Sequence, residues 1–172
     1  MEHVTGLKCT LCGEVYDPAE VAYVCPTDSG NLDVQYDYGR IAAHVQRNGL
    51  RNVTGMWRYK ALLPIAYEAA EPPLLVGDTP LYRADGVARE IKVGQVWIKD
   101  DGRNPTASLK DRASALVVAK ALAEGRNLVT TASTGNAAAA LAGLAASVHM
   151  PTVIFVPASA PEAKIAQLLV YG

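Results

Sequence analysis

The stretch RNPTASLKDR, residues 103–112, places a lysine where a positive charge is poorly accommodated. It lies between a strand-like run, QVWIKDD, and a helix-like run, ASALVVAKALAEG. Ser108 is suited to cap the helix and Asp111 to complete a capping box, so Lys110 falls in the first helical turn. The helix dipole disfavours a cation there by about 0.3–1 kcal/mol, which is less than one pKa unit.

Burial is the stronger influence, because desolvation lowers the pKa of a lysine by up to about 3–5 units. A buried Lys110 would be partly neutral near pH 7, and a neutral amine is the form that makes a Schiff base. The simpler interpretation is a surface lysine whose ammonium group reaches water. Composition alone favours this simpler interpretation, because most lysines are solvated.

A second group of polar residues, Ser133-Thr134-Gly135-Asn136, lies between a strand-like run and an alanine-rich helix-like run. Backbone N–H groups at such a helix start, together with these side chains, form a ready anion site. The alternative is a capped helix whose own free N–H groups are satisfied by Ser133, Thr134 and Asn136.

The elements that position both groups alternate regularly. We predict strands at 94–101, 127–133 and 152–157, and helices at 108–125, 135–148 and 160–172. This alternation indicates an α/β fold with a parallel sheet, and both groups would then follow adjacent strands, where ligands bind. A Schiff-base lysine beside a carboxylate site suggests amino-acid chemistry with pyridoxal phosphate.

The N-terminal part differs in composition. We predict a zinc-ribbon-like segment with short strands at 1–40, a helical extension broken at Pro64 and a connector at 41–84, and the first part of the α/β domains at 85–172. Cys9, Cys12 and Cys25 are candidate metal ligands, with Asp28 where a fourth cysteine would stand. Structural zinc sites usually use Cys and His, so we favour a metal-free relic over bound zinc.

Charge and hydropathy exclude several classes of protein. The net charge of −1 provides no basic field for nucleic acid. The longest uncharged apolar stretch is shorter than the roughly 20 residues of a membrane helix, and no signal peptide is evident. We therefore expect a cytoplasmic protein with no nucleic-acid or membrane partner.

Several segments, in order, resemble the N-terminal part of threonine synthases, which are fold type II, tryptophan-synthase-β-like pyridoxal phosphate enzymes. These segments are MWRYKALLP, GDTPLYRA, WIKDDGRNPTASLKDR, TTASTGNAAAALAGLAA and KIAQLLVYG. The resemblance implies a partial doubly wound parallel sheet, preceded by the small Cys-containing β knuckle. It also implies conversion of O-phospho-L-homoserine and water to L-threonine and phosphate, by a homodimer when full length.

The resemblance assigns roles to individual residues. Lys110 would hold the cofactor as a Schiff base and shuttle protons, and Asn136 would hydrogen-bond the pyridine 3′-oxygen. The substrate carboxylate and phosphate would be bound by Ser133, Thr134, Gly135, Asn136 and Ala137. The chain departs from many relatives at Ala107, where they have glycine, and at Ala137, where they have threonine.

Two alternatives stay open. One is another fold type II amino-acid lyase or synthase, such as threonine dehydratase or cysteate synthase, and the other is a non-catalytic fragment. The family's cofactor-phosphate loop and the partner of the pyridine nitrogen come later than residue 172. We therefore expect this chain to be the front part of a larger protein, and residues 1–172 alone to be inactive.

Overall fold

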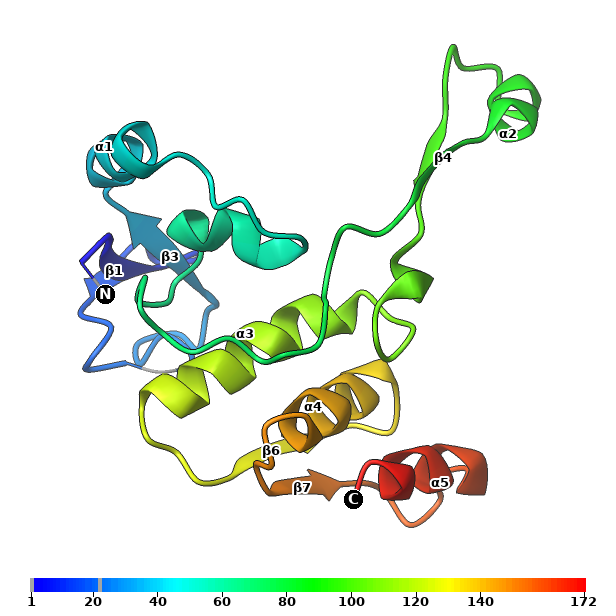
Figure 1. Cartoon of the computed structure of the whole chain (residues 1–172). Helices are drawn as coiled ribbons and strands as arrows, with labels where there is room; N and C mark the ends of the chain where they lie inside the picture. The colour runs from blue at the N-terminus through cyan, green and yellow to red at the C-terminus, as the bar shows by residue number, and fades with distance from the viewer. Residues whose placement is uncertain (1, 22) are drawn as a thin grey trace. The chain divides into compact units, whose positions relative to one another are not determined.

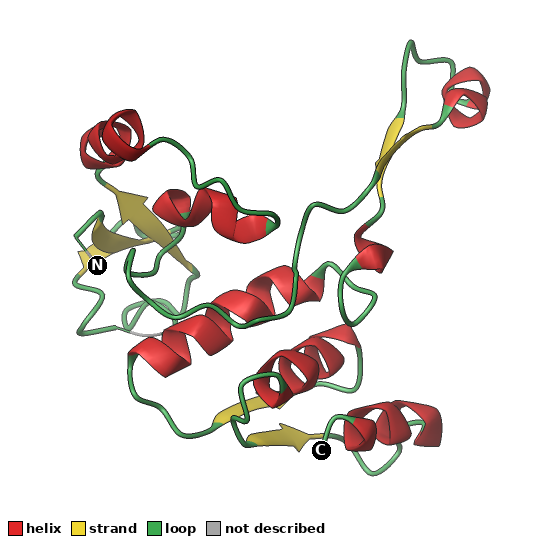
Figure 2. Cartoon of the chain, viewed as in Figure 1, coloured by secondary structure: helices red, strands yellow, loops and turns green. Residues whose placement is uncertain are grey.

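The computed structural model describes residues 2–21 and 23–172, which form two compact units. The first unit, unit 1, contains the described residues up to Asn52 together with Tyr59–Glu68. The second, unit 2, contains Val53–Arg58 and Ala69–Gly172. Helices and strands occur in both units (Figure 2). The domain boundaries expected after residues 40 and 84 stay a prediction.

Unit 1 is built on a small antiparallel sheet in which β1 is the central strand. Its elements are β1 (Val4–Cys9), β2 (Val15–Tyr16), β3 (Leu32–Tyr36) and α1 (Tyr38–Asn48). Lys8 pairs with Val15 on one side of β1 and with Asp33 on the other. Asp37 caps α1 by accepting a hydrogen bond from the Arg40 N–H. The prediction of short strands in this segment is confirmed.

A buried histidine connects the start of unit 1 to its second segment. His3 is 1% exposed, and its Nε2 lies 2.8 Å from the carbonyl oxygen of Leu63. Its ring stacks on that of Tyr67, with centroids 4.8 Å apart. The 3-10 helix η1 (Met56–Leu62), which precedes this contact, ends before Pro64 as predicted.

Unit 2 contains the predicted parallel β-α-β arrangement. β6 (Val129–Ala132) pairs in parallel with β7 (Thr152–Phe155), and α4 (Asn136–Ala146) connects them. A further helix, α5 (Glu162–Val170), follows β7 and contacts α4. Because parallel strands need a crossover connection, the alternation seen in the sequence was sufficient to predict this part of the fold.

The core of unit 2 lies around α4, which packs beside α3 (Lys110–Ala123) and against both parallel strands (Figure 1). Ala115, Val118 and Leu144 are 0% exposed. The alanines of α4 allow close approach of its neighbours, and dense packing of this kind leaves little room for a change of volume. Within the described residues, no helix has the length and hydrophobicity needed to cross a membrane.

One predicted strand pairs differently from expectation. β5 (Trp97–Lys99) pairs with β4 (Leu81–Arg83) in an antiparallel ribbon that leads to α2 (Asp85–Glu90), not with β6 in the parallel sheet. Every residue of β4 and β5 is exposed. The prediction was wrong because an apolar run specifies a strand but not its partner, and β4 supplies a partner nearby in sequence.

We expect Leu144→Ala to lower the free energy of unfolding of unit 2 by about 2–5 kcal/mol, because the lost side chain leaves a cavity in a packed core. Leu169→Ala is the matched control, since Leu169 is 73% exposed and its truncation should change stability little. Urea unfolding followed by circular dichroism measures both. Equal effects of the two substitutions would contradict the placement of the core.

Candidate active site

Lys110 is the first residue of α3, and the turn before it is shaped by local hydrogen bonds. The Lys110 N–H donates to Ser108 Oγ at 3.0 Å, but Leu109 and not Ser108 is the N-cap residue of α3. The predicted capping box is not formed. The Asp111 carboxylate instead accepts hydrogen bonds from the Thr106 N–H, at 2.8 Å, and from the Thr106 hydroxyl.

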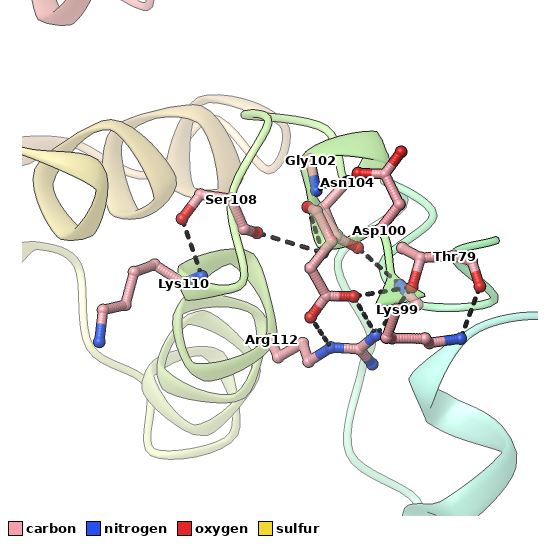
Figure 3. Close-up of polar contacts among 10 residues, drawn as sticks. Thr79, Lys99, Asp100, Gly102, Asn104, Ser108, Lys110 and Arg112 are labelled. Atoms are coloured by element: carbon pink, nitrogen blue, oxygen red, sulfur yellow. Dashed lines mark hydrogen bonds and ion pairs between the residues drawn. The ribbon is translucent and has the colours of Figure 1, made fainter. Parts of the chain in front are cut away.

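The Lys110 side chain is exposed, whereas Asp111 beside it is 0% exposed. The burial expected for a Schiff-base lysine is therefore absent from the described residues. Figure 3 shows the side chain extending away from the polar cluster around Arg112. The buried Asp111 carboxylate lies in the first turn, where the helix dipole favours a negative charge. The Asp111 charge also offsets the unfavourable interaction between the dipole and the neighbouring cation.

The polar cluster around Arg112 holds the first turn of α3 in place (Figure 3). Arg112 donates from Nε to Asp101 Oδ2 at 3.0 Å and from Nη2 to Asp101 Oδ1 at 2.8 Å. The Thr79 hydroxyl donates to the same Oδ1 at 2.7 Å. These donors, Arg112 foremost, lower the pKa of Asp101 to about 2. Asp101 opens the 3-10 helix η2 (Asp101–Arg103), so the pair joins η2 directly to α3.

Asn104 connects this loop to the GDTP segment at 77–80. Its amide nitrogen donates to the carbonyl oxygens of Asp101 and Ser108, both at 3.1 Å. Its Oδ1 accepts from the Gly77 N–H at 3.0 Å. Gly77 has φ +96°, a conformation that favours glycine. Two segments quoted separately in the sequence are thus parts of one support for Lys110.

Thr106 lies between the two helices that carry the candidate residues. Besides bonding Asp111 of α3, it approaches α4 at Gly143, where an added Cβ would lie 2.8 Å from Thr106 Cγ2. That separation is shorter than van der Waals contact, so glycine is required for the observed approach. The position of the Lys110 loop relative to α4 therefore depends on Gly143, which has no side chain.

The Ser133–Ala137 loop leads from β6 into α4, with Gly135 as the N-cap. Ser133 Oγ accepts a hydrogen bond from the Gly135 N–H at 3.2 Å, but no side chain caps the helix itself. Among the described contacts, the Thr134 hydroxyl and the exposed Asn136 amide make no hydrogen bond. An added Cβ at Gly135 would meet nothing within 4 Å. The capping alternative is therefore not supported, because Ser133 bonds the N-cap residue and no side chain bonds the N–H groups of the first turn.

The two groups of candidate residues do not follow adjacent strands of one sheet, as the sequence predicted. The Lys110 loop follows the antiparallel β5 and then η2, whereas the Ser133–Ala137 loop follows the parallel β6. They are brought into one unit by the packing of α3 against α4. An apolar groove formed by α4, β7 and α5 is lined by neither group.

Comparison with known proteins identifies the family. Residues 73–172 match the model of the pyridoxal-phosphate dependent enzyme family. The chain belongs to this family. It is 40% identical over 167 residues to a threonine synthase of Methanosarcina acetivorans, an alignment that covers 96% of this chain and 40% of that protein. The threonine synthase of Methanocaldococcus jannaschii is 36% identical, with 96% and 41% covered.

Solved structures agree with this assignment at the level of fold. The crystal structure of O-acetylserine sulfhydrylase isoform 3 from Entamoeba histolytica is similar with a TM-score of 0.52 and 24% identity, covering 56% of this chain and 31% of that one. The expected fold class, that of fold type II enzymes, is confirmed. The chain spans about two fifths of the length of the threonine synthases that it matches.

Sequence reasoning missed the residues that hold Lys110 in place, namely Thr79, Asp101, Asn104 and Arg112. Asp101 and Arg112 both lie in the segment WIKDDGRNPTASLKDR, but a loop separates them, so no helical or strand period relates them. The three cysteines belong to unit 1, where all are free thiols.

Replacing Asp101 should destabilise unit 2 in a pH-dependent way. The folded pKa of about 2 lies below the ordinary 3.8, so the Asp101 charge stabilises the fold fully above pH 3.8. This contribution is lost as the pH falls toward 2. We expect Asp101→Asn to cost about 1–2 kcal/mol near neutral pH, the lower part of the range for charged hydrogen bonds because the pair is partly exposed.

Urea unfolding of wild type and variant between pH 7 and pH 2.5 measures this difference. Asp100→Asn is the control, since the Asp100 side chain accepts a hydrogen bond from the Gly102 N–H, which an asparagine oxygen also accepts. A difference that does not shrink at acid pH would refute the charged role of Asp101.

Ala107, which precedes Ser108 in the Lys110 loop, adopts a left-handed conformation with φ +58°. Such a backbone costs a non-glycine residue about 1–2 kcal/mol, and glycine gives back about 0.5–1 of this through its unfolded-state entropy. We expect Ala107→Gly to raise the free energy of unfolding by about 0.5–1 kcal/mol. Ala113→Gly, at an exposed position inside α3, should lower it by a similar amount. Melting temperatures that shift in the same direction for both would contradict this.

Proposed function

We propose that the protein containing this chain is a threonine synthase, which converts O-phospho-L-homoserine and water to L-threonine and phosphate. The observation that carries the proposal is the alignment of both threonine synthases over nearly the whole chain, cysteine segment included. The family match alone supports pyridoxal phosphate chemistry of a broader kind. Homodimerisation and a cytoplasmic location are proposed on the same resemblance.

Lys110 is the residue proposed to hold pyridoxal phosphate. Its amine is exposed, so a cofactor can reach it, and its backbone is held by Ser108 and by the cluster at Arg112. When bound, the cofactor supplies an electron sink that stabilises negative charge at the substrate Cα. Attachment of the cofactor needs a lysine whose backbone is fixed at one position, because a misplacement of the reacting groups by about 1 Å can cost a large part of the rate.

The Ser133–Ala137 loop is proposed to bind the acidic groups of the substrate, and Asn136 the cofactor's 3′-oxygen. The free N–H groups at the start of α4 and the unbonded Thr134 hydroxyl are donors. The partial positive charge at a helix N-terminus favours a carboxylate or phosphate. The open space beside Gly135 leaves the backbone accessible to such a group.

Lys110 is also proposed to move the proton at the substrate Cα. Its Nζ must be neutral to accept that proton. Since the side chain is exposed in the described residues, we propose that the bound cofactor and substrate themselves exclude water from it. The Lys110 amine would then be shielded from water only when the site is filled.

We expect the full-length protein, supplied with pyridoxal phosphate and O-phospho-L-homoserine, to release threonine and phosphate in equal amounts. Lys110→Ala should reduce the rate at least about 100-fold, because the proton-transfer group is lost, and should remove the visible absorption band of the bound cofactor. Lys120→Ala is the matched control, as Lys120 is an exposed lysine of the same helix that pairs with Glu124.

Threonine and serine derivatives tested as competing substrates separate this proposal from other lyases of the fold. Turnover of threonine to a keto acid, with no release of phosphate from O-phospho-L-homoserine, would reject the threonine synthase assignment. Cofactor binding without any turnover would support a binding protein instead.

A further inference from the structure

Four side chains of unit 1 converge at one point, although none of them belongs to the proposed active site. The ligand atoms of Cys9, Cys12, Cys25 and Asp28 all lie within 4.8 Å of one another. Cys12 Sγ lies 3.7 Å from Cys25 Sγ, and Cys9 Sγ lies 3.3 Å from Asp28 Oδ1. Around a tetrahedral zinc with bonds of about 2.3 Å to sulfur and 2.0–2.2 Å to oxygen, neighbouring ligand atoms stand about 3.5–3.8 Å apart. The spacing is close to that of a four-ligand shell.

Two turns of nearly identical geometry present these side chains. The Gly13 N–H donates to the carbonyl oxygen of Cys9 at 3.1 Å, and the Ser29 N–H donates to that of Cys25 at 2.9 Å. Gly13 and Ser29 both have positive φ, +79° and +60°. Serine rarely adopts this conformation, so the second turn is kept against its local preference.

The equivalence of the two turns defines the place of the fourth ligand. Asp28 holds in the second turn the position that Cys12 holds in the first, each three residues after a buried cysteine. The Asp28 Oδ1 accepts a hydrogen bond from the Gly30 N–H at 2.8 Å, and Cys9 Sγ accepts one from the Leu11 N–H at 3.3 Å. Such donors orient ligands and partly neutralise their negative charge.

Hydrophobic packing does not explain why these turns stay together. Among described residues 9–21 and 23–31, the buried side chains are Cys9 and Cys25, each 1% exposed. The larger apolar residues nearby face solvent, with Leu11 72% and Tyr23 90% exposed. A segment with so little core needs another source of stability, and the free energy of metal binding is such a source.

We propose that Cys9, Cys12, Cys25 and Asp28 bind one zinc ion in a closed structural site. Thiolates select zinc over magnesium or calcium, and a carboxylate oxygen is an accepted fourth ligand. Four protein ligands leave no open position for substrate, so the ion stabilises the turns and takes no part in the reaction. This reverses the preference for a metal-free relic, which rested on the rarity of oxygen ligands rather than on geometry.

The proposal is tested on the full-length protein purified with its thiols reduced. We expect about one zinc ion per chain after extensive dialysis, by elemental analysis. Replacement by cobalt should produce the sulfur-to-metal charge-transfer absorption that thiolate ligands give. Zinc-free protein that shows no such absorption with cobalt, while all three thiols react with a thiol reagent, would overturn the proposal. So would an isolated Cys12–Cys25 disulfide that persists as the stable form in reducing buffer.

Variants test the fourth ligand separately from the cysteines. Asp28→Asn preserves the turn, because an asparagine oxygen also accepts the Gly30 N–H, and should weaken zinc affinity at least about tenfold through loss of an anionic ligand. Asp28→Cys should bind zinc at least as tightly as wild type. Asp17→Asn is the matched control, since the Asp17 Oδ1 accepts the Ala19 N–H at 2.8 Å in a similar turn.

Competition with a chromophoric chelator measures these affinities and does not depend on enzymatic activity. Affinities that are equal for Asp28→Asn and wild type would remove Asp28 from the site. Loss of enzyme activity with full zinc content would speak against the proposed function and leave the zinc site standing.

Discussion

The candidate active site depends on the hydrogen bonds that the Asp101 carboxylate accepts. Its two oxygens accept hydrogen bonds from the planar guanidinium of Arg112 and from the hydroxyl of Thr79. A bidentate pair of this kind fixes direction as well as distance, which a single point charge does not do. One carboxylate therefore joins the GDTP segment, the short helix η2 and the first turn of α3, where Lys110 begins the helix.

Several supporting residues around the Lys110 turn are buried, whereas Lys110 and Asn136 are exposed. Asn104, Ser108 and Asp111 are at most 5% exposed, while Lys110 and Asn136 face outward. The buried residues satisfy one another's hydrogen bonds and so have one stable arrangement. The exposed groups keep free donors and a free amine for a ligand. A rigid support under accessible groups is what a site for a cofactor and a small anionic substrate requires.

The two units use different physical means of stability. Unit 2 buries alanines, valines and leucines between α3, α4 and the parallel strands, so apolar burial accounts for its order. The turns of unit 1 bury two cysteines and almost nothing else. A metal shell would replace the missing core there, and its strength would depend on ligand chemistry rather than on packed volume.

The sequence by itself determined the α/β class, the β6–α4–β7 crossover and the placement of Lys110 in the first turn of a helix. Periodicity and turn residues are local properties, so a short stretch of sequence is enough to recognise them. Only the tertiary structure decided that β5 pairs with β4, that Asp111 bonds Thr106 and that Lys110 is exposed. It also decided that Arg112 meets Asp101 and that Asp28 joins the cysteines. Each of these depends on which segments meet in space, because hydrogen bonds and burial involve residues that are not neighbours in the sequence.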